Sequence, residues 1–64
     1  MRVNITAPTK HNARPYLDHV ADRIAEVLPA VMAYRETSDE RHRLYLEARL
    51  GELEHACQMA RQVL

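Results

Sequence analysis

The chain has 64 residues, with nine Lys/Arg, nine Asp/Glu, four His and one Cys, and its formal net charge is zero. Three tyrosines are its only aromatic residues, and a lone cysteine cannot close an intramolecular disulfide. No apolar run approaches the ~20 residues of a membrane span, and the N-terminus lacks a signal-peptide stretch. These features predict one small cytoplasmic domain, and such domains usually need disulfides, a metal or self-association for stability.

The zero net charge hides a difference between the two ends of the chain. Residues 1–15 carry three basic residues and no acid, whereas residues 16–64 carry six basic and nine acidic residues. An acidic body does not favour broad contact with a phosphate backbone. Nucleic acid is therefore not the expected partner of the body, although the basic start keeps it as an alternative.

Residues 1–11 are predicted to form an extended or disordered N-terminal arm. Polar and apolar residues alternate over residues 2–6, which is the period of a strand, and Pro8 then interrupts regular structure. This start resembles ribbon-helix-helix repressors, whose short strands pair across a dimer and read the major groove. The resemblance implies DNA contacts by Arg2, Asn4 and Thr6.

Residues 12–64 are predicted to form a helical hairpin, whose first helix starts at Asn12 with Pro15 in its first turn. Pro29 lies opposite the apolar stripe of this helix, where it bends the helix, and a break into two helices at Leu28 is the alternative. The stripe has the 3-4-3-4-3 spacing of a heptad seam: Leu17, Val20, Ile24, Val27, Val31 and Tyr34.

The second helix is predicted to start at a capping box formed by Thr37 and Glu40. Its apolar stripe is one residue out of register with that of the first helix, which favours a turn near residues 35–38 over one continuous bent helix. Two antiparallel helices leave much of each stripe exposed, so we expect two all-α hairpins to dimerise into a four-helix bundle. The second stripe comprises Leu46, Leu50, Leu53, Cys57, Ala60 and Leu64.

Another set of positions on the second helix is a candidate surface for a partner. Gly51 lies at its centre, where the missing side chain lets another backbone approach closely, and the alternative is a weakly amphipathic solvent face. The set follows a 4-3-4-4 spacing away from the apolar seam: Leu44, Ala48, Gly51, His55 and Met59.

Apolar residues also gather near the predicted turn, where they form either a partner site or a plug that closes the end of the hairpin. Tyrosine and methionine are suited to protein interfaces, and Arg41 and Arg49 lie four residues either side of Tyr45, within reach of its ring. The residues concerned are Met32, Tyr34, Leu44 and Tyr45.

The sequence offers little for catalysis or metal binding. Glu52 and His55 have the spacing used in di-iron bundles, but both lie outside the predicted seam and the first helix offers no seam carboxylate. Cys57 is expected to act as a small apolar residue, and a disulfide between subunits requires the seam itself to lie on the two-fold axis. No enzyme activity, cofactor or metal is therefore expected.

These observations predict a non-enzymatic, cytoplasmic homodimer that acts as a regulator, inhibitor or adaptor by binding a larger protein. The size also suits a phage- or mobile-element-encoded protein. The alternative is a dimeric repressor that binds DNA through residues 2–6. A structural subunit of a larger assembly cannot be separated from the first hypothesis by sequence.

Overall fold

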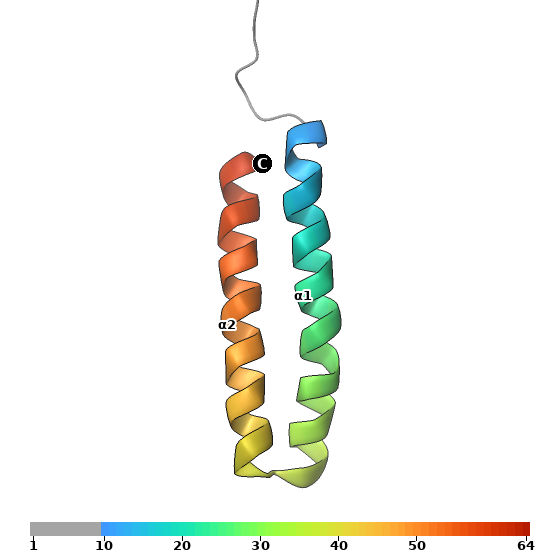
Figure 1. The fold of residues 1–64 in the computed structure, drawn as a ribbon, viewed down its shortest axis with the longest axis vertical. Coiled ribbons are helices and arrows are strands. Elements are labelled where there is room, and N and C mark those ends of the chain that lie inside the picture. Colours follow the sequence, from blue (N-terminus) through green and yellow to red (C-terminus); the bar gives the residue numbers. More distant parts are fainter. Residues whose placement is uncertain (1–9) are drawn as a thin grey trace, which may run out of the picture.

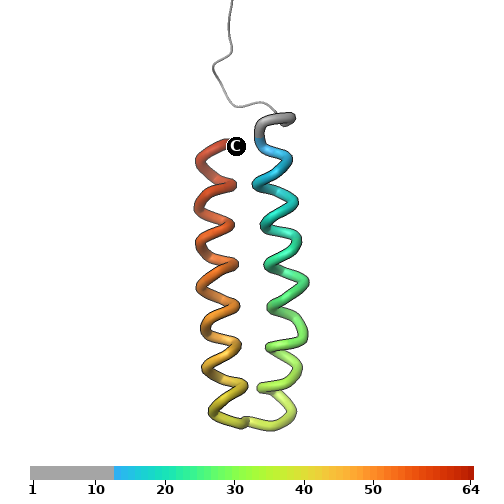
Figure 2. The backbone as a smooth tube through the Cα atoms, in the orientation of Figure 1, coloured from blue at the N-terminus to red at the C-terminus, as the bar shows by residue number. Residues whose placement is uncertain are grey.

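The computed structural model describes residues 10–64, and the side chains of residues 13–64. This part of the chain forms two helices, α1 (Lys10–Thr37) and α2 (Glu40–Val63), and contains no strand. The helices run antiparallel and side by side over their whole length, so that the C-terminus lies beside the start of α1 (Figures 1 and 2). The predicted two-helix hairpin is confirmed. Its first helix begins two residues before the predicted start, and the rest of the predicted arm lies outside the described residues.

The first helix passes through both of its inner prolines without interruption. Pro29 lacks an N–H group, so one helical hydrogen bond is missing at this position. Its side chain is exposed, whereas the neighbouring Ala30 is buried. The proline ring therefore lies away from α2, and the alternative of a helix break at Leu28 is wrong.

The turn between the helices is tighter than the sequence predicts, and its cap is a different residue. Helix α1 extends through Thr37, whose hydroxyl donates to the carbonyl of Ala33. Ser38 then adopts a left-handed conformation with φ 53°. Asp39 caps α2, because its side chain accepts a hydrogen bond of 2.9 Å from the amide of Arg41. The predicted capping box at Thr37 is therefore wrong, since that residue still belongs to α1.

The face along which the helices meet, which we call the inner seam, differs in part from the predicted stripes. Val20, Val27 and Tyr34 are half-buried on α1, as are Leu46 and Leu53 on α2, in agreement with the prediction. Five other residues of the predicted stripes are exposed instead: Leu17, Ile24, Val31, Leu50 and Leu64. Two packed helices cover a narrow line on each other, whereas the apolar stripes are wider than that line. Part of each predicted stripe therefore stays exposed in one hairpin, as expected from the sequence.

The most deeply covered residues of the inner seam are small. Among the described residues, only Ala13, Ala30, Ala56 and Ala60 are buried, with exposed fractions of 5% or less. Alanine adds little side-chain volume between the helices, so their backbones can approach closely. The contact between α1 and α2 therefore buries little apolar volume. Within residues 10–64, neither helix is long and apolar enough to cross a membrane.

Candidate functional site

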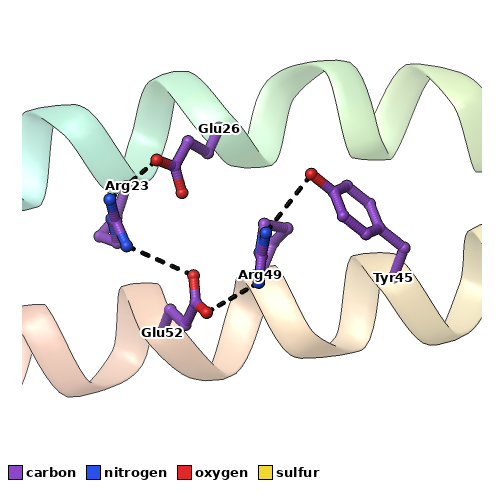
Figure 3. Close-up of polar contacts among 5 residues, drawn as sticks. All are labelled: Arg23, Glu26, Tyr45, Arg49 and Glu52. Carbon is purple, nitrogen blue, oxygen red and sulfur yellow. Dashed lines mark hydrogen bonds and ion pairs between the residues drawn. The ribbon is translucent and has the colours of Figure 1, made fainter.

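One side of the hairpin, which we call the polar flank, carries a network of charged side chains that joins the two helices (Figure 3). The Arg23 guanidinium donates to Glu26 on its own helix at 2.8 Å and to Glu52 on α2 at 3.4 Å. The other carboxylate oxygen of Glu52 accepts from Arg49 at 2.7 Å. Glu52 thus bridges two arginines that come from different helices.

Tyr45 extends this network towards the turn. The Arg49 guanidinium carbon lies 4.8 Å from the centre of the Tyr45 ring, and Arg49 donates to the tyrosine hydroxyl at 3.4 Å (Figure 3). This confirms the predicted contact of Arg49 with the ring, whereas Arg41 is paired with Asp39. The hydrogen bond to Tyr45, together with the charge of Glu52, raises the pKa of Arg49. The arginine is therefore held as a cation with both neighbours in place.

Sequence reasoning missed this network because it searched the seam for apolar residues. Arg23 and Arg49 are both less exposed than the five exposed apolar residues of the predicted stripes, since their long stems cover the seam while their charged ends reach its edge. A signal was present in the spacing. Each helix contains Arg-x-x-Glu, at residues 23–26 and 49–52, and antiparallel packing places the two copies side by side.

The opposite side of the hairpin, which we call the apolar flank, exposes large aliphatic side chains from both helices. Ile24 and Leu50 each precede a glutamate of the polar flank by two residues, which places them about 160° away around their helices. Both therefore lie on the same side of the hairpin, away from the network. The exposed residues of this flank are Leu17 (45%), Ile24 (54%), Leu28 (62%), Val31 (37%) and Leu50 (39%), with the half-buried Cys57 beside them.

The predicted partner surface on α2 forms a continuous exposed line, which we call the outer stripe: Leu44, Ala48, Gly51, His55 and Met59. Leu44 is 52% exposed, and nothing lies within 4 Å of the point where a side chain on Gly51 would begin. Only Met59 is half-buried. The stripe is thus open along its length, and its centre offers bare helix surface.

The C-terminal end of the outer stripe opens into a depression of about 390 Å³ between the helices. His55 and Met59 line one wall, and Pro15, Tyr16 and His19 of α1 line the other. Its walls are mostly apolar, with two imidazole rings that supply hydrogen-bonding groups. The depression can receive an apolar or aromatic side chain from a molecule that lies along the outer stripe.

The residues predicted to gather at the turn are not assembled into one patch. Tyr34 is half-buried towards α2, and Met32, two residues away on α1, therefore faces away from α2. Met32 is 39% exposed, and Leu44 and Tyr45 are both 52% exposed. These exposed fractions do not fit a plug that closes the end of the hairpin. Leu44 instead belongs to the outer stripe, and Tyr45 belongs to the polar network.

The candidates for metal binding and catalysis are separated or otherwise engaged. The Glu52 carboxylate accepts hydrogen bonds from two arginines. Within the described residues, no group of three or more His, Cys, Asp or Glu side chains is placed to hold a metal ion. Cys57 is a free thiol on the edge of the apolar flank. The candidate DNA contacts Arg2, Asn4 and Thr6 lie outside the described residues.

A scan of protein-family models finds no match to the chain, and searches of curated proteins and of solved structures find no significant similarity either.

Proposed function

We propose that the chain is a non-enzymatic, dimeric regulator, inhibitor or adaptor of the cytoplasm, and that it binds a larger protein through the outer stripe of α2. The observation that carries the proposal is the stripe itself, which runs from Leu44 past Gly51 to the depression beside Met59. Small residues at its centre and a recess at its end match a helix or extended segment that anchors one large side chain.

The chemistry of the stripe supports a protein as the ligand. Leu44, Ala48, Gly51 and Met59 are uncharged, and the depression at the end of the stripe is lined mostly by apolar and aromatic side chains with two histidines. A phosphate backbone would require several cationic side chains along this line. The arginines nearest to it, Arg41 and Arg49, are paired with Asp39 and Glu52. An apolar stripe with a polar margin is typical of protein–protein interfaces.

The proposal is tested by crosslinking at matched alanine positions. A photoreactive amino acid is placed at Ala48, on the stripe, or at Ala25, an equally small exposed residue of α1 that faces away from α2. Illumination in host lysate, with and without nuclease, should give a discrete adduct with a larger protein from position 48 only. Adducts of equal yield from both positions, or adducts that nuclease abolishes, would contradict the proposal.

A second variant tests the bare centre of the stripe. Gly51→Arg adds a long side chain where another backbone would lie, and the open space around Gly51 means that the hairpin itself has no clash to relieve. Helical circular dichroism should stay unchanged, while the adduct from position 48 should be lost. Ala25→Arg serves as the control, because it adds the same side chain on the far side of the molecule.

A further inference from the structure

The apolar flank lacks a cover in the single chain. Its five large aliphatic residues are 37–62% exposed, and exposed apolar groups clustered on one face can mark an interaction site. The inner seam, by contrast, fully buries only alanines. A two-helix hairpin with so small a core gains stability when a second molecule covers this flank.

We propose that a second copy of the chain covers the apolar flank. The two copies are antiparallel, and their two-fold axis passes beside Ile24. The inference rests on the dimeric part of the proposed function and adds the face and the arrangement. The turns of the two hairpins then lie at opposite ends of a four-helix bundle. A larger partner remains free to bind the outer stripe, because that stripe lies on the other side of α2.

The position of the axis follows from the register of the hairpin. Arg23 of α1 pairs with Glu52 of α2, so Ile24 lies level with Gly51, and a single axis at this height crosses the middle of both helices. A two-fold axis there places Ile24 against Ile24 of the second copy. Leu17 and Val31 lie seven residues either side of Ile24, so Leu17 of one copy meets Val31 of the second copy.

The same axis also pairs the apolar residues of α2. The axis crosses α2 between Gly51 and Glu52. This point lies midway between Leu50 and Leu53, so Leu50 of one copy meets Leu53 of the other. It also lies midway between Leu46 and Cys57, which meet in the same way. In the first pair Leu50 is exposed and Leu53 is half-buried, and in the second pair Leu46 and Cys57 are both half-buried. The exposed aliphatic residues of both helices thus find apolar partners about one axis, which is the self-complementarity that a two-fold interface requires.

The charged side chains of the polar flank make it less suited than the apolar flank to contact with a second copy. Two copies joined along that side would bring the paired arginines and glutamates of both chains out of water, which gains little or costs free energy. The arrangement also places Cys57 against a leucine of the second copy. The intersubunit disulfide considered from the sequence is therefore not expected.

The test uses cysteine crosslinking in the full-length chain, with Cys57→Ser as the background. Ile24→Cys places two thiols face to face at the axis, whereas Asp22→Cys places them on the far side of α1. Under mild oxidation, the Ile24→Cys chain should form disulfide-linked dimers on the order of tenfold faster or more, because the interface raises the effective thiol concentration. Sedimentation of the unmodified chain should give twice its 7.4 kDa mass.

Three results overturn the inference. A dimer in which both cysteine variants crosslink at equal rates places the contact on another face, and it leaves partner binding by the outer stripe intact. A 7.4 kDa monomer at micromolar concentration removes the dimer, whereas crosslinking from position 48 still tests the partner. If Ile24→Cys loses its helical circular dichroism, mixed Leu17→Cys and Val31→Cys chains test the same axis, and absence of a mixed disulfide then contradicts the proposal.

Discussion

The two flanks of the hairpin differ in how many of their side chains find partners within one chain. On the polar flank, Glu52 pairs with both Arg23 and Arg49, and its salt bridge to Arg23 joins α1 to α2, although the Nε atoms of both arginines are buried without a hydrogen-bond partner. On the apolar flank, Ile24 and Leu28 are more than half exposed and contact water. The polar flank therefore fixes how the two helices fit together. The other holds the apolar surface whose burial favours association.

The largest expected effect comes from a charge placed between the two flanks. Leu53 is half-buried at the middle of the inner seam, next to the fully buried Ala56. Leu53→Asp replaces an apolar side chain of the seam with a carboxylate whose desolvation is costly, so we expect loss of cooperative folding. Thermal melting followed by circular dichroism measures this. A native-like melting curve would show that the seam is assigned incorrectly.

A wedge in the seam should have the next largest effect. Ala56 is 1% exposed, so Ala56→Leu must push the helices apart, at a cost of roughly 1–3 kcal/mol in the free energy of unfolding. Ala48→Leu adds the same side chain on the exposed face of α2 and should change stability little. Urea unfolding of both variants distinguishes them. Equal stability would mean that the helices are not closely packed at position 56.

Single substitutions on each flank should separate the fold of one hairpin from the association of two. Glu52→Gln removes the carboxylate shared by two arginines and should lower stability by roughly 1 kcal/mol or less, with a reduced dependence on salt. Leu28→Asp should leave the helices of one chain intact but shift the monomer–dimer equilibrium towards the monomer. Melting at several protein concentrations shows the difference, because only the second variant should lose the concentration dependence. The opposite pattern would reverse the assignment of the flanks.

A substitution in the turn that joins the helices should stabilise the hairpin. Ser38 has a positive φ of 53°, which disfavours residues with a side chain. Ser38→Gly should therefore stabilise the hairpin by about 0.5–1 kcal/mol, and Ser38→Val should destabilise it. Urea unfolding measures both, and a loss of stability in the glycine variant would contradict the turn geometry.

Low pH should destabilise the start of α2, and we expect this change in stability to be the smallest of those predicted. The backbone and side-chain hydrogen bonds from Arg41 lower the pKa of Asp39, and the side-chain hydrogen bond from Arg43 lowers the pKa of Glu40. A carboxylate with a lowered folded-state pKa contributes stability above its unfolded pKa of about 4 and loses it as the pH falls through the folded value. Melting temperatures should therefore drop below about pH 4.

Asp39→Asn is the control, because asparagine caps a helix without titrating. This variant should lose part of the acid-dependent step and keep its helix. An unchanged acid step would place its origin in other carboxylates.

The sequence predicted the hairpin correctly because the two apolar stripes change register where the chain turns. It placed Ile24 and Leu50 on the apolar stripes but could not show which edge of each stripe faces the other helix, and both residues lie on the exposed edge. Hydrophobic periodicity also overlooks arginine, although the stem of Arg23 covers the seam. The capping residue was missed for a local reason. Helix α1 continues through Thr37, and this moves the cap to Asp39.

The four buried alanines have a consequence for the lifetime of the protein in a cell. A chain that covers so little in isolation spends more time open to proteases than one with a large core, since cleavage follows the population of unfolded molecules. In the proposed dimer, association with a second copy protects the chain, and that protection grows with concentration. Newly made chains should then turn over rapidly until enough of them accumulate to pair, and the proposed dimer would thus set a lower limit on the amount at which the protein persists.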